Sequence, residues 1–466
     1  MIRARHKHEV RSQSEHGKRD VAFYLFCAFL VSYFGRLTAR LSVLGAIHFD
    51  FLLAAITAAA IVLSANSSKR SSRLDRDPVA KQLWILLGYI IVTLPFVEWP
   101  GSAIHNLETF TKSLCFFFFV VATVDTTRKL RILLVVYTVT QVWRVLEPLG
   151  MHIQSGYWGS MTSLGNWEYM DRLEGSPYDI INPNGLAFVI ILSLPLLALV
   201  LKPNTAAKGI ALGLLVIAMC YALVLSASRS GFLGLVVLGV LVAWRSKQRA
   251  GYFTAGAVIA LISVSLMTDL QRERYVSIFS HSAKGGGTAE GRITGVLDDF
   301  EVSLRRPLFG HGLGTSREAN ANFRGVDMPS HNLYTEVAEE LGYIGLVLML
   351  MLLWSFVRVC LTAQRLVAAT PMTDSRLRFL HDMARTLILV VMVDLFFSFA
   401  SFGFSEPYWY FFGGLSVVTA RLAAKLAPDG GLPAVRQSSG AKRRRLGQPL
   451  RPRQTLARPT SRVRTR

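Results

Sequence analysis

The short segment Ser228-Arg229-Ser230-Gly231 joins two apolar stretches and places an arginine between two hydroxyl side chains. An arginine inside a bilayer costs about 2.5–3.5 kcal/mol on insertion scales, so its presence needs a reason. A guanidinium binds phosphate oxygens through two parallel hydrogen bonds, and Ser228 and Ser230 could add donors to a diphosphate. The alternative is an interfacial arginine that extends toward the headgroups.

A second arginine, Arg172, precedes the segment Asn182-Pro183-Asn184-Gly185. Proline is favoured at the first position of a helix and asparagine at the N-cap, so a helix is predicted to begin at Pro183. The N-terminus of a helix attracts anions, and Arg172 with Asn184 could contribute to such a site. Plain helix capping beside a solvated loop arginine is the alternative.

The segment Ser330-His331-Asn332-Leu333-Tyr334 lies where a long polar stretch meets an apolar block. We expect Ser330 or His331 to open the helix. A histidine side chain can accept a proton at neutral pH and act as a general base. An interfacial histidine beside a Tyr334 of the aromatic belt is the alternative, and the glycines that follow could serve close helix packing.

The stretch Arg305-Arg306-Pro307 continues into Phe309-Gly310-His311-Gly312-Leu313-Gly314, whose glycines permit a sharp turn with positive φ. Arg292, Arg305 and Arg306 add positive charge to the same long polar stretch. Asp298 and Asp299 are its only acidic pair. A metal site would need more carboxylates or histidines nearby, so no metal is predicted.

These residues must be positioned by apolar elements, because 52% of the chain is hydrophobic and only 17% is charged, against about 25% charged in soluble domains. A segment of about 20 apolar residues crosses a bilayer, and about twelve such blocks are present. The first part of the long block 332–361 is expected to be interfacial or broken. The blocks are 21–35, 41–65, 82–98, 105–125, 130–147, 183–201, 207–226, 230–244, 251–268, 332–361, 383–402 and 407–424.

The distribution of Lys and Arg orients this predicted bundle, because cytoplasmic loops of membrane proteins are enriched in both. With a cytoplasmic N-terminus, the loops 66–81, 126–131, 202–208, 245–249 and 362–382 are cytoplasmic, and all are basic. The loops 148–182 and 269–331 then lie outside, with Arg172, Arg229 and His331. Arg36 and Arg40, in the first outer loop, are the exception to the rule.

Both ends of the chain are basic, and the net charge is +21. Segment 1–20 and the tail 426–466, with Lys442-Arg443-Arg444-Arg445, are predicted to be cytoplasmic, the tail disordered, around a membrane domain at 21–425. Such a tail could bind nucleic acid, but basic termini on the cytoplasmic side of an anionic membrane are the favoured interpretation. The four cysteines lie in apolar blocks without metal-ligand spacing, and no cleavable signal sequence is recognised.

Four segments together resemble the O-antigen ligase and O-antigen polymerase superfamily of bacterial envelope glycosyltransferases. They occur in the family's order and spacing, over about residues 80–425. They are RLEGSPYDIINPNGLA (172–187), SASRSG (226–231), RPLFGHGLGT (306–315) and HNLYTEVAEELGYIG (331–345).

The resemblance implies an all-α, polytopic transmembrane bundle of GT-C-like fold. It implies a glycan donor carried on undecaprenyl diphosphate, used at the periplasmic face of the inner membrane without metal or cofactor. Arg172 and Arg229 would bind the diphosphate, and His331 would lie beside the reacting sugar as the proton acceptor of an inverting transfer. The further substrate-binding candidates on the matching segments and their surroundings are Arg292, Arg306, Ser228, Ser230, Asn184, Asn332, Tyr334 and Glu340.

The motifs do not separate ligases, which use a lipid A-core acceptor, from polymerases, which join saccharide repeat units, including those of exopolysaccharides. A transporter of an anionic solute or lipid-linked glycan is the main alternative. Transporters commonly contain two related halves and binding groups near the midplane, whereas here no repeat is recognised and the candidates gather at one face. A non-catalytic envelope scaffold would not need arginines clustered beside a histidine.

Overall fold

The computed structural model describes residues 20–65, 77–165, 168–244, 251, 265, 267–276, 287–370, 374–401 and 403–427. The basic N-terminal segment, nearly all of the basic tail and most of the predicted span 251–268 therefore lie outside the described residues. The side chain of Arg292 is also outside the description, so its predicted role stays a prediction.

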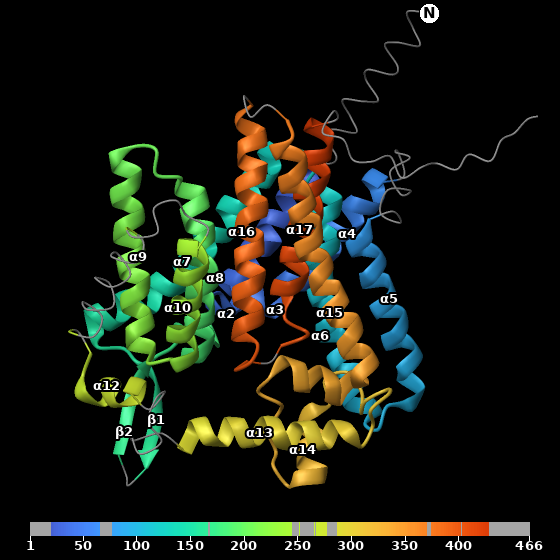
Figure 1. Cartoon of the computed structure of the whole chain (residues 1–466), viewed down its shortest axis with the longest axis vertical. Helices are drawn as coiled ribbons and strands as arrows, with labels where there is room; N and C mark the ends of the chain where they lie inside the picture. The colour runs from blue at the N-terminus through green and yellow to red at the C-terminus, as the bar shows by residue number, and fades with distance from the viewer. Residues whose placement is uncertain are drawn as a thin grey trace, which may run out of the picture. The chain divides into compact units, whose positions relative to one another are not determined.

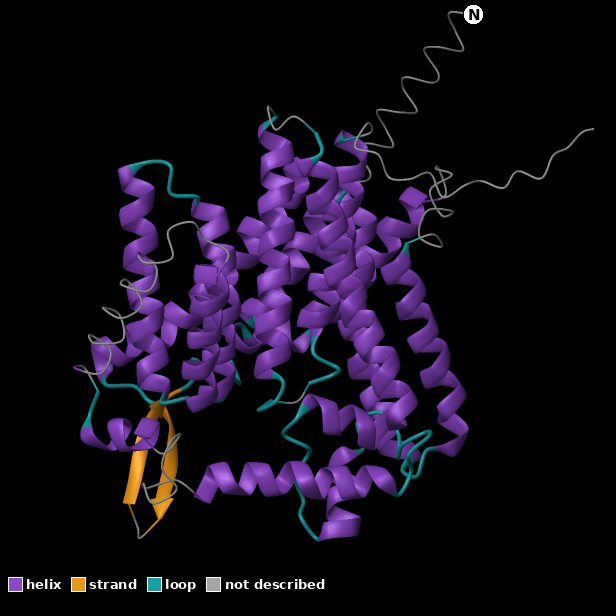
Figure 2. Cartoon of the chain, viewed as in Figure 1, coloured by secondary structure: helices purple, strands orange, loops and turns teal. Residues whose placement is uncertain are grey.

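Helices make up nearly all of the regular secondary structure in the described residues, with a single two-stranded sheet (Figure 2). The first described helix is Asp20–Gly35. The later elements are α2 (Leu37–Arg40), α3 (Ser42–Ala46), α4 (Phe49–Ala65), α5 (Pro78–Thr93), the 3₁₀ turn η2 (Leu94–Phe96), α6 (Pro100–Thr123), α7 (Thr127–Ser155), β1 (Gly159–Gly165), β2 (Glu168–Leu173), α8 (Pro183–Leu201), α9 (Ala206–Ser226), α10 (Arg229–Trp244), α12 (Asp269–Val276), α13 (Gly287–Leu304), α14 (Ser316–Arg324), α15 (Leu333–Ala368), α16 (Ser375–Phe397) and α17 (Pro407–Leu426).

Several of these helices have the length and composition to cross a membrane, which makes the chain a multi-pass membrane protein. Among the described residues, α7, α8, α9, α15 and the continuous segment Pro78–Phe96 meet both criteria. Asp20–Gly35, Phe49–Ser64 and Arg229–Trp244 are shorter apolar helices. Each predicted block apart from 251–268 coincides with a described helix. The count of twelve spans and the GT-C-like fold stay predictions.

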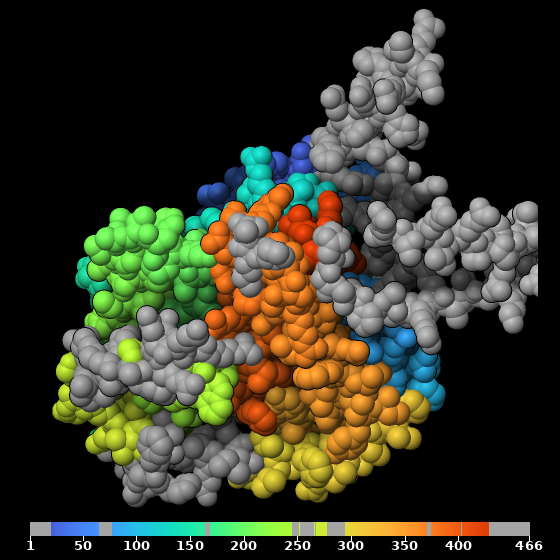
Figure 3. All heavy atoms as spheres, turned by 45° about the horizontal axis from the view of Figure 1, so that its top comes forward, coloured from blue at the N-terminus to red at the C-terminus, as the bar shows by residue number. Residues whose placement is uncertain are grey.

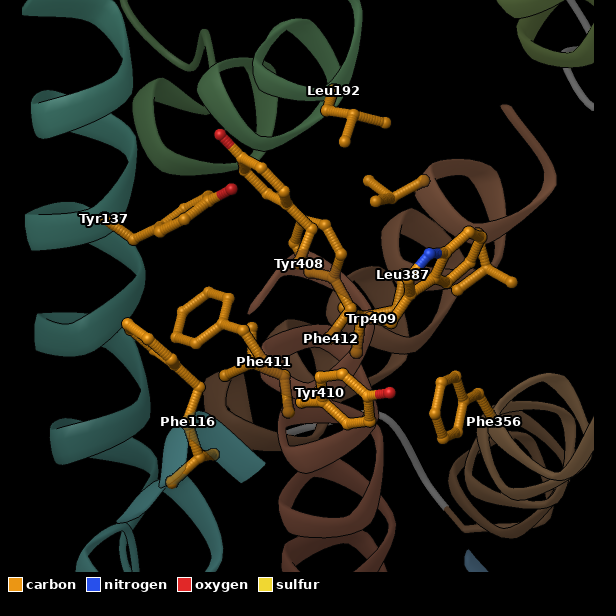
Figure 4. Close-up of a cluster of buried hydrophobic side chains, with 14 of the residues drawn as sticks. Phe116, Tyr137, Leu192, Phe356, Leu387, Tyr408, Trp409, Tyr410, Phe411 and Phe412 are labelled. Carbon is orange, nitrogen blue, oxygen red and sulfur yellow. The ribbon is translucent and has the colours of Figure 1, made fainter. Parts of the chain in front are cut away.

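The bundle is centred on α17, whose residues from Pro407 to Thr419 are all buried. A helix that is buried around its whole circumference belongs to the interior of a bundle. It packs against α6, α15 and α16. Figure 4 shows the aromatic cluster at its start, where Phe411 stacks on Tyr137 with ring centroids 4.5 Å apart.

The two long segments predicted as loops are largely ordered elements, which corrects the prediction. Within 148–182, α7 continues to Ser155 and is followed by the antiparallel β1–β2 hairpin. Within 269–331 lie α12, α13 and α14. Polar, short elements give little hydropathy signal, so a reading of apolar blocks does not detect them. In Figure 1 the hairpin and α12, α13 and α14 lie at the same end of the bundle, and Figure 3 shows α13 and α14 (yellow) along one edge beside α15 (orange).

A buried ion pair secures the segment that leads into α8. The Arg144 guanidinium of α7 donates from Nε to Asp179 Oδ2 (2.6 Å) and from Nη2 to Oδ1 (3.0 Å), and both side chains are buried. Arg36 approaches the same carboxylate at 3.7 Å, and Arg40 pairs with Glu147. Arg36 and Arg40, the exceptions in the charge pattern, thus have acidic partners on their own side of the bundle.

We predict that Asp179→Asn lowers the stability of the protein by about 3–5 kcal/mol, since it leaves the buried Arg144 charge without its counter-charge. Thermal denaturation of the detergent-solubilised protein measures the effect. Asp327→Asn is the matched control, because Asp327 pairs with Arg317 in similar geometry at an exposed position and exposed pairs contribute little. Equal melting temperatures for the two variants would contradict this account.

Candidate functional site

The turn between α9 and α10 forms the centre of the candidate site. Ser226 ends α9, Ala227 adopts a left-handed conformation (φ 45°), and Arg229 begins α10. Ser226, Ala227 and Ser228 are fully buried, while Arg229 is partly exposed. Ser228 Oγ accepts a hydrogen bond from Gly231 N (3.2 Å) and lies 3.2 Å from Ser230 Oγ. The hydroxyls predicted beside Arg229 are thus fixed at the N-terminus of a helix.

Arg172 extends from β2 into this turn, as a shared site requires. Its Nε donates to Ser226 O (2.8 Å) and its Nη2 to Asn184 Oδ1 (3.1 Å). Asn184, in the first turn of α8, also accepts from Ser228 Oγ (2.9 Å). The first turn is capped as predicted, since Asn182 Oδ1 accepts from Gly185 N. The structure therefore brings together Arg172, Asn184, Ser228 and Ser230 from segments far apart in the sequence, with Arg229 adjacent in the chain.

A further arginine that the sequence reading did not select contacts the same turn. Arg274 of α12 is buried and donates from Nε to Ala227 O (3.0 Å). The hydrogen bonds of Arg172 and Arg274 to this turn go to neutral carbonyl oxygens and do not themselves cancel the two charges. Burial raises the pKa of Glu174, two residues beyond Arg172, while the charge of Arg172 acts in the opposite direction.

His331 lines a cavity of about 270 Å³ that meets this group only at Asn184, because Arg172, Ser228, Arg229 and Ser230 are not among its lining residues. Asn182, Asn184 and His331 line it, so the amide that binds Arg172 on one side faces the histidine's cavity on the other. His331 is exposed, whereas the residues on either side of it are buried. The volume of this cavity matches one saccharide unit and is too small for a whole glycan chain.

Asp299 of α13 binds the turn that carries His331. Asp299 Oδ2 accepts from Ser330 Oγ (2.7 Å), and its Oδ1 accepts from Arg324 Nη1 (2.9 Å) and Asn320 Nδ2 (3.2 Å). Ser330 Oγ also lies 2.8 Å from Thr335 Oγ1. One carboxylate thus ties α13, α14 and the start of α15 together and fixes where His331 emerges.

Asn332 and Tyr334, predicted as substrate-binding residues, make contacts within the protein. Asn332, not Ser330 or His331, is the N-cap of α15, and its Oδ1 accepts from Tyr334 N (2.9 Å) and Thr335 N (3.3 Å). The Tyr334 hydroxyl donates to Leu395 O (2.7 Å). Asparagine competes well with serine at an N-cap, and here the helix begins one residue later than predicted.

Arg306 and Glu340 lie outside the lining of the His331 cavity. Arg306 donates to Phe96 O (2.7 Å) and approaches Glu98 at 3.6 Å, while the buried Glu340 accepts from Gly314 N (2.7 Å). The predicted break in α15 is at Gly342 (φ 68°), where Tyr343 N bonds to Pro307 O. These contacts lock the glycine-rich turn onto α15.

Charged residues that were not predicted also line the His331 cavity, namely Arg36, Arg144, Asp394 and Glu406. Asp394 lies within the apolar block of α16 and Arg144 within that of α7. An ionisable residue within a membrane-spanning segment is itself a signal of function, and this signal could have identified both from the sequence.

The fold and the site define a multi-pass membrane protein in which arginine and serine side chains gather around the α9–α10 turn, next to the cavity of His331. Residues 214–350 match the family model described as O-Antigen ligase. Over these residues, the match confirms the O-antigen ligase and polymerase superfamily that the motifs resemble. The matched region includes Arg229 and His331, and Arg172 precedes it. A search of curated proteins found no match.

We predict that Asn184→Leu lowers the stability by about 1–3 kcal/mol, because Arg172 and the buried Ser228 hydroxyl lose the acceptor that they share. Thermal denaturation measures the loss. Asn204→Leu, at an exposed position between α8 and α9, controls for the same chemical change. An unchanged melting temperature for Asn184→Leu would mean that this hydrogen-bonded junction does not hold the site together.

Proposed function

We propose that this protein transfers a glycan from undecaprenyl diphosphate to a saccharide acceptor at the periplasmic face of the bacterial inner membrane. The observation that carries the proposal is Asn184, whose side chain binds Arg172 and Ser228 and also lines the cavity of His331. A site for an anion and a site for a proton acceptor are thereby adjacent.

The diphosphate leaves more readily when its developing charge is neutralised. Arg172 and Arg229 are the proposed diphosphate ligands, and Ser230 adds a hydroxyl at a helix N-terminus, where anions are favoured. Ser228, which is buried and donates to Asn184, positions that residue. A single well-placed donor at a developing oxyanion stabilises a transition state by about 2.7–4 kcal/mol. Arg274 donates a hydrogen bond to the backbone carbonyl of Ala227 in the α9–α10 turn and contributes a third positive charge there.

His331 is the proposed general base. As the acceptor hydroxyl oxygen forms a bond to the anomeric carbon, its proton moves to the imidazole and the bond from that carbon to the diphosphate oxygen breaks. A direct displacement of this kind inverts the anomeric centre. None of these steps requires a metal ion in the proposal, since the arginines supply the positive charge.

A transporter of a lipid-linked glycan is the alternative. The position of the site favours the enzyme, because β2, α12 and the start of α15 lie at the same end of the bundle (Figure 1), whereas transporters commonly bind their substrate near the midplane. The basic loops predicted to be cytoplasmic support a periplasmic orientation of the site. The acceptor is either a lipid A-core, for a ligase, or another repeat unit, for a polymerase.

We predict that Arg229→Ala reduces glycan transfer at least as much as His331→Ala, for which a loss of about 10²–10⁴-fold is expected. Purified protein is incubated with undecaprenyl-diphosphate glycan and candidate acceptors, and the products are separated by size on a gel. One added glycan block indicates a ligase, and a ladder of repeats indicates a polymerase.

Arg229→Lys is the matched variant, since it keeps the charge but loses the paired donors, and it should retain more activity than Arg229→Ala. Melting temperatures of all three variants control for folding. Wild-type transfer by Arg229→Ala would exclude the proposed diphosphate role, and transport of the glycan without any transfer would favour the alternative.

A further inference from the structure

A second and larger cavity, of about 1050 Å³, lies next to the candidate site. It is lined by the first described helix, α4, α6 and the short helices between them. Its walls are mostly apolar, with small residues such as Ala54 and Ala58 on α4 facing Phe29 and Phe119. Tyr33 and Arg36 line both this cavity and that of His331. The two spaces therefore adjoin at Arg36.

Arg36 occupies a backbone conformation that arginine rarely adopts. Its φ of 53° and ψ of 42° are left-handed, at the end of a helix where glycine is the usual residue. His48, which also lines the larger cavity, has φ 48° at the end of α3. Side chains with a Cβ are strained in this region, and such strain concentrates at functional sites. Two strained cationic or protonatable residues therefore face one cavity.

The side chain of Arg36 lies at the junction of the two cavities. Asp179 is 3.7 Å from Arg36 and accepts two hydrogen bonds from Arg144. Glu406 also lines the His331 cavity and interacts electrostatically with both arginines, while the side chain of Arg36 remains 41% exposed. Of the other charged groups that line the larger cavity, Asp50 accepts from Thr38 (3.0 Å), and Glu108 pairs with Lys112 (2.6 Å).

An apolar cavity that ends at an exposed guanidinium fits an amphiphile with a hydrocarbon chain and an anionic head. We propose that this cavity holds the polyprenyl chain of the lipid-linked donor and that Arg36 receives its phosphate-bearing head as it enters the His331 cavity. The small alanine side chains leave space along one wall of the cavity, whose volume of about 1050 Å³ can take part of a long hydrocarbon chain. This inference rests on the proposed function for the identity of the lipid.

Binding is tested on the full-length protein in detergent, with undecaprenyl phosphate as the probe and native mass spectrometry as the readout. Ala58→Trp fills the cavity and is expected to weaken binding at least tenfold. Ala59→Trp is the matched control, because Ala59 is the neighbouring exposed residue and does not line the cavity. Equal binding by the two variants would overturn the proposal.

The head-group contact is tested by Arg36→Gly, which removes the charge and relieves the backbone strain, so the variant is expected to fold. Its affinity for undecaprenyl phosphate should fall about tenfold. Lys202→Gly removes a cation from another left-handed position (φ 33°) outside both cavities and should bind as the wild type does. An unchanged affinity for Arg36→Gly would exclude Arg36 as the head-group ligand.

The location is tested through Cys115, a partly exposed free thiol in the cavity wall, whereas the other three cysteines are buried. Undecaprenyl phosphate should slow maleimide labelling of Cys115 at least fivefold, and phosphatidylglycerol at the same concentration should not. Equal protection by both lipids would mean that the cavity accepts any membrane lipid. If the protein transfers glycan but undecaprenyl phosphate does not protect Cys115, only the inference about this cavity is refuted. If the lipid protects Cys115 but the protein transfers glycan to no acceptor, only the proposed function is refuted.

Discussion

The buried guanidinium of Arg172 is the constraint on which the rest of the site depends. A charge removed from water destabilises a protein unless hydrogen bonds replace its hydration, and here the replacements come from three separate segments. Ser226 O lies at the end of α9, Asn184 lies in α8, and Thr162 lies on the partner strand of the hairpin. Satisfying this one side chain therefore fixes the hairpin, the α9–α10 turn and the start of α8 relative to one another.

The same principle extends to the neighbouring charged residues. Arg144 and Asp179 secure the segment that leads into α8, and Asp299 secures the turn that presents His331. Each is a buried polar group whose partners lie on different elements, so each defines a position rather than simply adding stability. His331 is exposed and Arg36 is partly exposed, and both line the His331 cavity. The buried hydrogen-bonded pairs thus fix the helices, and His331 and Arg36 can contact a substrate.

The apolar helices, the N-cap of α8 and the break in α15 could be predicted because each depends on local residue types. The contact of Arg172 with the α9–α10 turn could be expected because both belong to the same set of motifs. The sequence did not predict α12–α14 or the hairpin, whose polar residues lack a hydropathy signal. Arg274 lies in α12, one of these unpredicted helices, and was therefore not recognised as a site residue. Asn332 and Tyr334 lie beside His331 in the sequence, but their side chains bond to the protein backbone, and only coordinates distinguish such contacts from a substrate site.

Fixed positive charge and a proton acceptor are proposed to act together on one diphosphate-linked substrate. The most direct measurement is a cryo-EM reconstruction of the full-length protein with undecaprenyl diphosphate bound. We expect the diphosphate to lie within hydrogen-bonding distance of the Arg229 guanidinium, next to Asn184, with His331 facing the position at which the anomeric carbon of the glycan would be attached. A diphosphate bound elsewhere, separated from His331 by the helices of the bundle, would contradict it.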